Sequence, residues 1–441
     1  MVNIEQLYQY YQQHPHVFTD TRKARKGGIF FAIGQKDKRG KGIHRGNNFA
    51  IEAIERLGAA YAVVNDPTLE QHPKYAAHFL LVEDCEHTLQ QLAQHHRQQL
   101  GIPVIAIAGS NGKTTTKELL HRVLEKNYRV FSTQGNLNNH LGVPLSMLQI
   151  DSSVELALLE LGANHLGETA FLAQLTMPDY GIITNCGKDH LGEYGSVENV
   201  IKANGELFDY LALNTGHAFV NGDDPIILRL STKVKNRSFY GREQEVSAQI
   251  TKRPLIELEL SIGEVVSRVQ TQLFGAFWLD TLIGVAHIAH HFGVAPITIK
   301  NGIEAYSPAS LRSQQISWQG HSVLLDCYNA NPSSMDVFIV AVQESASTSK
   351  ILILGEMLEL GKYSQKEHLR LLNQIDYQAF EQVIVIGKVF QAIERPNQSQ
   401  LIYLEDTIAL KNYLERHKSW NKETAFFVKG SRENKLETIF L

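Results

Sequence analysis

The residues with the clearest potential for chemistry lie at 104–116, where an apolar run is followed by a short polar loop. The loop contains Gly109 and Gly112 and leads into Lys113 and Thr114. Glycines there let backbone N–H groups converge on phosphate oxygens, the lysine neutralises phosphate charge, and the threonine hydroxyl can hold Mg²⁺. The loop is a shortened form, because Ile107 stands where the usual phosphate-binding pattern has its first glycine.

This pattern predicts a nucleotide site rather than a purely structural turn. The helix expected after the loop is amphipathic, with its apolar side chains at helical spacing between 119 and 124. A strand, a glycine loop and a helix therefore follow one another, as a phosphate cradle requires. The residues of this segment expected to bind the nucleotide are Gly109, Ser110, Asn111, Gly112, Lys113, Thr114 and Thr115.

Three further polar clusters follow apolar runs. Glu160 ends the run 156–160, His190 follows the run at 180–184, and Asp326 ends the run 322–326. Carboxyl ends of parallel strands meet at one edge of a sheet, so these side chains could gather near bound phosphates. A carboxylate in such a place suits a Mg²⁺ ligand or a base, whereas a lone histidine is more often structural. Their occurrence together downstream of a phosphate loop favours a catalytic edge.

The elements that would position these residues alternate between strands and helices. From 101 to about 305, apolar runs are separated by helical segments, which predicts a mostly parallel sheet covered on both faces. A β-rich insert at about 236–272 alternates polar and apolar residues and is expected to be antiparallel. A third α/β unit begins near Leu311, with strands expected at 322–326, 350–355, 382–387 and 424–429.

Composition limits the class of protein. The chain has 441 residues, 43% hydrophobic and 20% charged, with a net charge of −4. A globular protein of about three domains is expected, with no basic field that would favour nucleic acid. The first residues resemble no signal peptide and no long uncharged apolar stretch occurs, so we expect a cytoplasmic protein without a membrane span. The three cysteines are far apart and suggest neither disulfides nor zinc.

Over nearly its whole length the sequence resembles the Mur ligases. The strings Tyr328-Asn-Ala-Asn-Pro332 and Met357-Leu-Glu-Leu-Gly361 are the most diagnostic for one branch of that family. The other matching motifs are Thr19-Asp-Thr-Arg22, Gly109 to Lys117, Gly135-Asn-Leu-Asn-Asn139, Glu160-Leu-Gly162, Ile183-Thr-Asn185, His190-Leu, Asn221-Gly-Asp-Asp224, the stretch around Arg312 and Lys429-Gly-Ser-Arg432.

The resemblance implies a three-domain α/β protein: a UDP-sugar-binding domain at 1–100, a central ATP-binding domain at 101–310 and a Rossmann-like domain at 311–441 that binds the amine and closes on ATP. It implies an ATP-dependent amide ligase that works through an acyl phosphate. For this branch it implies addition of D-alanyl-D-alanine to UDP-N-acetylmuramoyl-tripeptide in peptidoglycan synthesis. These are small-molecule substrates, and a monomer without a nucleic-acid partner is expected.

The resemblance also implies roles for particular residues. Lys113, Glu160 and His190 would be catalytic, and Mg²⁺ would be held by Thr114, Glu160 and His190. From the third domain, nucleotide contacts would come from Arg312, Asp326 and Asn329. The UDP-sugar would be met by Asp20, Arg22, Asn136, Asn138 and Asn139.

Several positions depart from the family pattern. Asn204 stands where these ligases carry a carbamylated lysine that bridges metal. The apolar residues of that helix place Asn204 on its inward face, whereas Lys202, about 200° around at roughly 100° per residue, should point outward. Trp278 lies in a string that usually carries asparagines, and we expect it to be a core aromatic rather than an adenine platform. Lys188 and Asp189 precede His190, where the family has alanine before the histidine.

These departures leave two alternatives open. One is a related ligase that acts on a different carboxylate and amine, since the central chemistry is shared within the family. The other is a catalytically impaired protein that still binds nucleotide.

Overall fold

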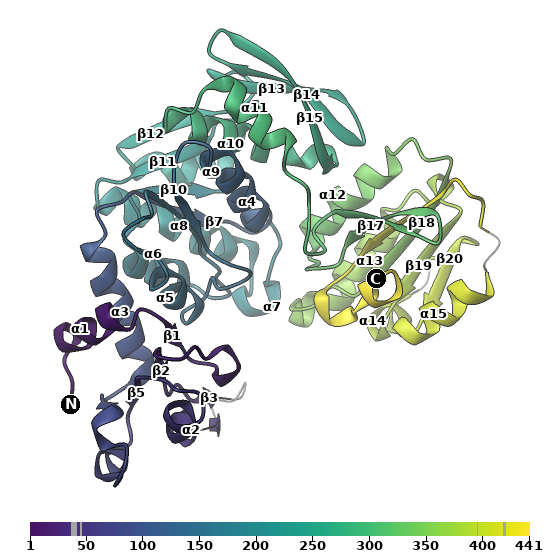
Figure 1. The fold of residues 1–441 in the computed structure, drawn as a ribbon. Helices are drawn as coiled ribbons and strands as arrows, with labels where there is room; N and C mark the ends of the chain where they lie inside the picture. The colour runs from purple at the N-terminus through teal and green to yellow at the C-terminus, as the bar shows by residue number, and fades with distance from the viewer. Residues whose placement is uncertain (37–41, 45, 395, 418–419) are drawn as a thin grey trace. The chain divides into compact units, whose positions relative to one another are not determined.

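The computed structural model describes residues 1–36, 42–44, 46–394, 396–417 and 420–441 (Figure 1). The chain divides into two compact units. The first comprises Met1–Ala106, Tyr128–Ala163 and Glu168–Gly181, and the second comprises Ile107–Asn127, Asn164–Gly167 and Ile182–Leu441. Within the described residues, no helix combines the length and apolar character that crossing a membrane requires.

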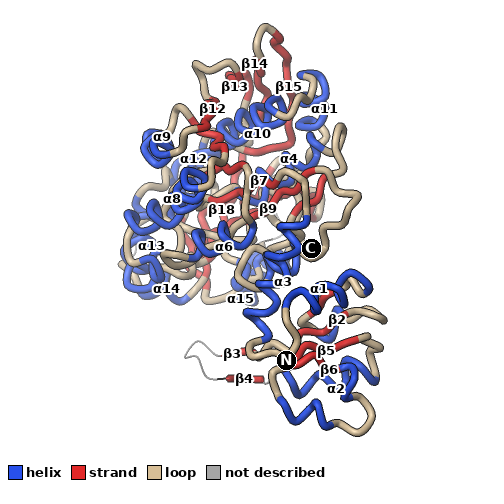
Figure 2. Tube along the Cα trace, turned by 90° about the vertical axis from the view of Figure 1, so that its left-hand side faces the viewer, coloured by secondary structure: helices blue, strands red, loops and turns tan. Residues whose placement is uncertain are grey.

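The first unit opens with a small sheet of order β1-β2-β5-β6, whose strands all pair in parallel. The caps follow from the sequence: Asn3 begins α1 with a reciprocal capping box, and Asp84 accepts two backbone N–H bonds at the start of α3. Figure 2 shows these strands with α1 and α2 beside them. The bounds are α1 Ile4–Gln13, β1 Val17–Phe18, β2 Ile29–Phe31, β3 Gln35–Lys36, β4 Gly42–His44, α2 Ala50–Glu55, β5 Tyr61–Val64, β6 Phe79–Leu81 and α3 Cys85–Gln99.

The central sheet has six strands in the order β12-β11-β10-β7-β9-β8. Every residue of β7 and β9 is buried, as expected for strands covered on both faces. The predicted α/β alternation is therefore confirmed. Its strands are β7 Val104–Ala108, β8 Val130–Ser132, β9 Leu156–Glu160, β10 Tyr180–Ile183, β11 His217–Asn221 and β12 Asn236–Tyr240. Its helices are α4 Lys113–Leu124, α5 Gly142–Met147, α6 Glu168–Thr176, α7 Leu191–Tyr194, α8 Val197–Leu213, α9 Pro225–Leu230, α10 Leu279–His291 and α11 Pro296–Glu304.

The predicted antiparallel insert is confirmed only in part. β13 Val246–Lys252, β14 Leu255–Ile262 and β15 Val265–Phe274 form an antiparallel sheet that packs on α10 and α11 (Figure 2). The first residues of the expected insert, however, form β12, which pairs in parallel with β11 at the edge of the central sheet. The reason is that α9 carries the chain back after β11, and such a crossover returns the next strand in parallel.

The C-terminal segment, residues 311–441, contains a six-stranded sheet of order β16-β17-β21-β18-β19-β20. Only the β16–β17 pair is antiparallel. The four predicted strands are present as β17, β18, β19 and β21, and the two edge strands β16 and β20 were not foreseen. The strands are β16 Gln314–Trp318, β17 His321–Asp326, β18 Ser349–Gly355, β19 Gln382–Ile386, β20 Leu401–Leu404 and β21 Thr424–Lys429. The helices are α12 Pro332–Gln343, α13 Ser364–Asn373, α14 Lys388–Ala392 and α15 Thr407–Arg416.

Candidate active site

The predicted phosphate loop joins β7 to α4. Gly109 and Gly112 adopt φ angles of 127° and 83°, which favour glycine. A Cβ atom on Gly109 would lie 2.1 Å from the hydroxyl of Thr184, so no side chain fits there. Gly112 precedes α4 and provides no side-chain cap, which leaves the first turn of the helix suited to an anion. Thr114 and Thr115 lie in that turn and are buried.

The loop after β10 braces the phosphate loop. The Thr184 hydroxyl and the Asn185 amide both donate to the carbonyl oxygen of Asn111, at 2.7 and 2.9 Å. The backbone N–H groups of Ser110 and Asn111 donate to Asn185. Thr184 and Asn185 belong to the Ile183-Thr-Asn185 motif, for which the sequence alone indicated no role. Their role here is to fix the shape of the cradle.

Charged groups also surround the loop. The Ser110 hydroxyl donates to Asp189 over 2.5 Å, and Asp189 is buried. The Lys113 ammonium donates to the carbonyl oxygens of Gly109 and Ser110, so this cation is held over its own loop. A phosphate bound at the loop would meet Lys113 where it already lies. Asp189 was noted in the sequence only as a departure from the family pattern.

His190 lies just before α7 in a left-handed conformation, with φ of 45°. Its Nδ1 atom is 2.7 Å from Oε2 of Glu359, which belongs to the motif singled out at 357–361. Burial alone would lower the pKa of His190, but the Glu359 carboxylate and the nearby Asp189 outweigh burial and raise it. Because Nδ1 faces Glu359, a metal contact would have to use an unprotonated Nε2 atom.

In the first unit, Glu160 ends β9 and is 2% exposed. Its Oε1 atom accepts a hydrogen bond of 2.9 Å from the amide of Asn138, so two predicted site residues meet. Asn139 instead uses its side-chain oxygen to accept the backbone N–H groups of Leu141 and Gly142. Asn136 is exposed. Of the three asparagines, Asn138 is the one joined to the buried carboxylate.

The other predicted UDP-sugar residues, Asp20 and Arg22, form a bidentate pair. The guanidinium of Arg22 donates to both carboxylate oxygens of Asp20, with the shortest bond at 2.7 Å. The hydrogen bond from Arg22 lowers the pKa of Asp20 to about 2. The Arg22 side chain remains 88% exposed, so its cation is open to an anionic partner.

The three predicted residues of the C-terminal segment lie around the end of β17. The guanidinium of Arg312 stacks on the ring of Tyr328, 3.6 Å from its centroid. Asp326 accepts from the ammonium of Lys429 over 2.5 Å and from the backbone N–H of Ser313. Asn329 is exposed, and its side-chain oxygen accepts from the next backbone N–H group.

The departures from the family pattern have clear structural counterparts. Asn204 is buried in α8, where its amide donates to the carbonyl oxygen of Val200, and Lys202 is exposed, so both predicted orientations are confirmed. Trp278 is buried, as expected for a core aromatic, but it also lies against the phosphate loop. A Cβ atom on Gly112 would be 3.6 Å from its ring. The Trp278 indole N–H has no hydrogen-bond partner among the described residues.

Comparison with known proteins identifies relatives of this chain. Residues 107–289 match the Mur ligase middle domain, and residues 311–431 match the Mur ligase glutamate ligase domain. The chain is 32% identical over 384 residues to the UDP-N-acetylmuramoyl-tripeptide–D-alanyl-D-alanine ligase of Bacillus subtilis, covering 86% of this chain and 82% of that protein. It is 30% identical over 436 residues to the ligase of the same name from Escherichia coli, covering 96% and 92%.

A solved structure has the same fold. MurF from Acinetobacter baumannii matches with a TM-score of 0.84 and 27% identity, over 99% of this chain and 97% of that one. The phosphate loop, the two domain matches and the extent of these similarities lead to one conclusion. The chain belongs to the Mur ligase family of ATP-dependent ligases.

Proposed function

We propose that this ligase joins D-alanyl-D-alanine to UDP-N-acetylmuramoyl-tripeptide. ATP would phosphorylate the terminal carboxylate of the tripeptide, and the amine of the dipeptide would then attack the acyl phosphate. The products are the amide, ADP and phosphate. The observation that carries the proposal is the braced phosphate loop, with Lys113 held over it, in a chain whose relatives bear this activity in their names.

The chemistry of the loop supports phosphoryl transfer. Lys113 can neutralise the charge that develops on the migrating group, and the open first turn of α4 can bind phosphate oxygens. The Glu359 carboxylate lies 2.7 Å from Nδ1 of His190, so the ring is held in place instead of turning freely. The braces from Thr184 and Asn185 keep the cradle in one shape before nucleotide arrives.

Mg²⁺ is suited to the oxygen donors that the sequence offers. Thr114 provides a hydroxyl and Glu160 a carboxylate, and Mg²⁺ prefers hard oxygen ligands together with substrate phosphates. An ion held by such donors would neutralise phosphate charge. Among the described residues no three His, Cys, Asp or Glu side chains are grouped to hold a metal unaided. His190 would reach a second ion only through Nε2.

We further assign the UDP-sugar to residues 1–100, ATP to residues 101–310 and the dipeptide to residues 311–441. Exposed Arg22 is a cation in the first region that suits a diphosphate. The enzyme would act in the cytoplasm as a monomer.

The direct test is phosphate release from ATP and Mg²⁺, with UDP-N-acetylmuramoyl-tripeptide and D-alanyl-D-alanine together and with each omitted. We expect release only when both are present, and a product heavier by one dipeptide in the mass spectrum. Release that follows a different carboxylate or amine would identify another ligase of the family. Binding of ATP without release under any combination would favour an impaired ligase.

A further inference from the structure

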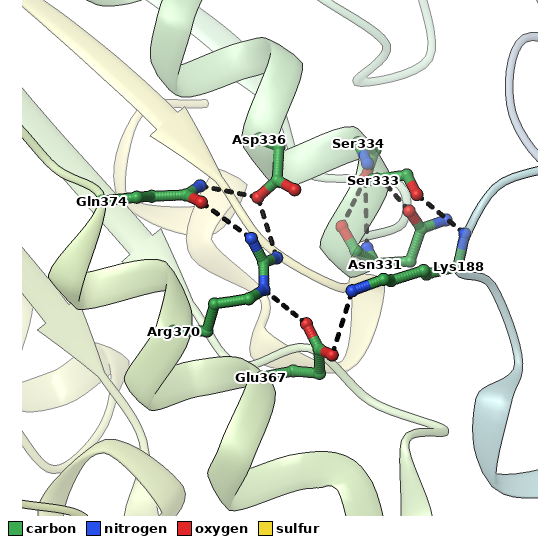
Figure 3. Close-up of polar contacts among 8 residues, drawn as sticks. All are labelled: Lys188, Asn331, Ser333, Ser334, Asp336, Glu367, Arg370 and Gln374. Carbon is green, nitrogen blue, oxygen red and sulfur yellow. Dashed lines mark hydrogen bonds and ion pairs between the residues drawn. The ribbon is translucent and has the colours of Figure 1, made fainter.

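Lys188 connects the loop after β10 to the C-terminal segment. Its backbone N–H donates to the hydroxyl of Ser333 over 2.7 Å. Its ammonium group lies 3.3 Å from Oε1 of Glu367 on α13. Figure 3 shows the side chain extending from its loop toward this carboxylate. Lys188 thus makes two contacts in opposite directions, one at the start of α12 and one on α13.

The carboxylate that receives Lys188 is held in place before the lysine reaches it. Glu367 is buried, and its other oxygen accepts a 2.7 Å hydrogen bond from Arg370. Arg370 in turn contacts Asp336 on α12 at 2.9 Å, and Gln374 bonds to both of them (Figure 3). Burial alone would raise the pKa of Glu367, but Arg370 and Lys188 outweigh burial and lower it. The network therefore presents a fixed anion to Lys188.

The same junction reaches the phosphate loop. Asn331, which caps α12, donates from its side-chain amide to the side-chain oxygen of Asn111 over 2.8 Å. A Cβ atom on Gly187 would lie 2.9 Å from the Ser333 hydroxyl and 3.1 Å from the Asn111 amide. The absence of a side chain at 187 lets the loop approach closely. The Lys188–Ser333 contact and the Asn111–Asn331 bond therefore belong to the same tight approach.

Apolar packing holds the same elements together more broadly. Leu191 and Tyr194 of α7 belong to one buried cluster with Met335 and Phe338 of α12 and with Leu360. Apolar contacts tolerate sliding, whereas a charged contact with a fixed partner selects one position. The apolar cluster holds these elements together, and the polar contacts fix their position relative to one another, which is called the register below.

We propose that Lys188 is a positioning residue that sets the C-terminal segment against the phosphate loop in the register needed for ligation. It acts through Glu367 and Ser333 on α12 and α13, and so brings Asn331 onto Asn111. It does not touch the reacting atoms. The proposal rests on the proposed function where it concerns turnover, but the register itself can be measured without substrate.

The kinetic test uses Lys188→Met, Glu367→Gln and the double variant in the full chain, with Lys188→Arg as the conservative replacement. Each single change should lower kcat about tenfold through misplacement of the C-terminal segment, while the ATP dissociation constant stays within about twofold. The double variant should be no slower than the slower single one, because both changes remove one contact. Lys188→Arg should retain most of the turnover. The matched control is Lys366→Met, which removes an exposed lysine beside Glu367 on the same helix.

The substrate-free test measures the distance between labels on Leu213→Cys and Ile408→Cys, two exposed positions on α8 and α15. Cys186 is replaced by serine, and the other two cysteines are buried. The parent should give one narrow distance distribution, and Lys188→Met should broaden or shift it while Lys366→Met does not. An unchanged distribution in Lys188→Met, or independent multiplicative losses of kcat in the double variant, would overturn the proposal. Absent turnover in the parent with a broadened Lys188→Met distribution would reject only the proposed function.

Discussion

The two large sheets end in similar polar residues but use them in different ways. At the end of β7, Lys113 bonds to carbonyl oxygens of its own loop, which a bound phosphate can replace as partners. At the end of β17, Asp326 is paired with Lys429, whose side chain is only 3% exposed. The edge at β7 therefore presents a cation that a ligand can bind, whereas the edge at β17 neutralises its carboxylate with a lysine of the same sheet. The partner of a strand-end residue, more than its position, decides whether it is available.

The turns beside these residues also differ in which residue types adopt positive φ angles. The phosphate loop uses glycines for its left-handed positions, whereas the turn before β16 has Ser310, Leu311 and Ser313 at φ angles of 54°, 62° and 52°. Each such residue costs about 1–2 kcal/mol. Bonds to the end of β17 and the residue after it help to hold this turn: the carbonyl oxygen of Leu311 accepts from the N–H of Cys327, and the N–H of Ser313 donates to Asp326. Asp326 therefore stabilises the turn that carries Arg312, besides any contact with nucleotide.

The largest effect expected at the phosphate-loop edge is the loss of Lys113. Lys113→Met removes the cation but keeps an apolar stem, so the rate of ligation should fall by about 10³-fold or more. The unfolding midpoint in urea should stay the same, because within the described part of the chain the hydrogen bonds of this lysine stay in its own loop. Steady-state kinetics and urea titration of one preparation measure both. A stability loss as large as the activity loss would mean that Lys113 holds the fold together, as Asp326 is expected to do at the other edge.

At the C-terminal edge the opposite result is expected. Asp326→Ala leaves the buried Lys429 ammonium without its counter-ion, which should lower the free energy of unfolding by about 3–5 kcal/mol. Urea unfolding followed by circular dichroism measures this change. Adding Lys429→Met should restore most of the lost stability, since the unpaired charge is then gone. A variant that keeps its stability and loses only nucleotide affinity would place Asp326 with the ligand instead.

Local patterns were enough to predict much of this molecule. The strand, glycine loop and helix at 104–124, four strands of the C-terminal sheet and the inward position of Asn204 all follow from spacing within one short segment. The bond between Asn138 and Glu160 joins two predicted residues, but their roles remain predictions. Periodicity and glycine placement carry this information because they depend on backbone geometry alone.

Pairings between distant segments could not be predicted in the same way. Asp326 meets Lys429 because β17 lies beside β21 in register, which no local pattern states. Glu359 meets His190, and Asp189 meets Ser110, for the same kind of reason. The parallel position of β12 also depends on the sheet that receives it. Each of these contacts decides whether a charged side chain is available to bind a ligand. The roles of the site residues therefore could not be predicted without the tertiary structure.

A buried histidine in α10 behaves differently from the paired charges at the two edges, because its ring bonds to a hydroxyl group. His287 of α10 bonds to the Ser238 hydroxyl at 2.8 Å, and its ring lies near Tyr240 and Phe219. Burial, together with His291, His217 and His290, lowers its pKa to about 4. The unfolded chain, with an ordinary pKa near 6.5, binds this proton first as pH falls.

Stability should therefore be complete above about pH 6.5 and should fall as pH drops toward about 4, by up to about 3 kcal/mol from this group. Urea unfolding at several pH values measures the slope. His287→Gln, which cannot titrate, should show a shallower slope in that window than the parent does. Equal slopes in the two proteins would mean that other groups cause the acid sensitivity.

The smallest effect is expected at Asn204, where the central site departs most from its family. The Asn204 amide bonds to the carbonyl oxygen of Val200 one turn earlier in α8, so it serves its own helix. Asn204→Ala removes that bond and should lower the free energy of unfolding by about 1 kcal/mol, with turnover within about threefold of the parent. Asn204→Lys tests the family's usual residue and should give no gain if the edge already works with Lys113, Glu160 and His190. Turnover could instead fall more than about tenfold in Asn204→Ala without a matching loss of stability. That result would mean that the Asn204 amide acts on the active site itself and not only on its own helix.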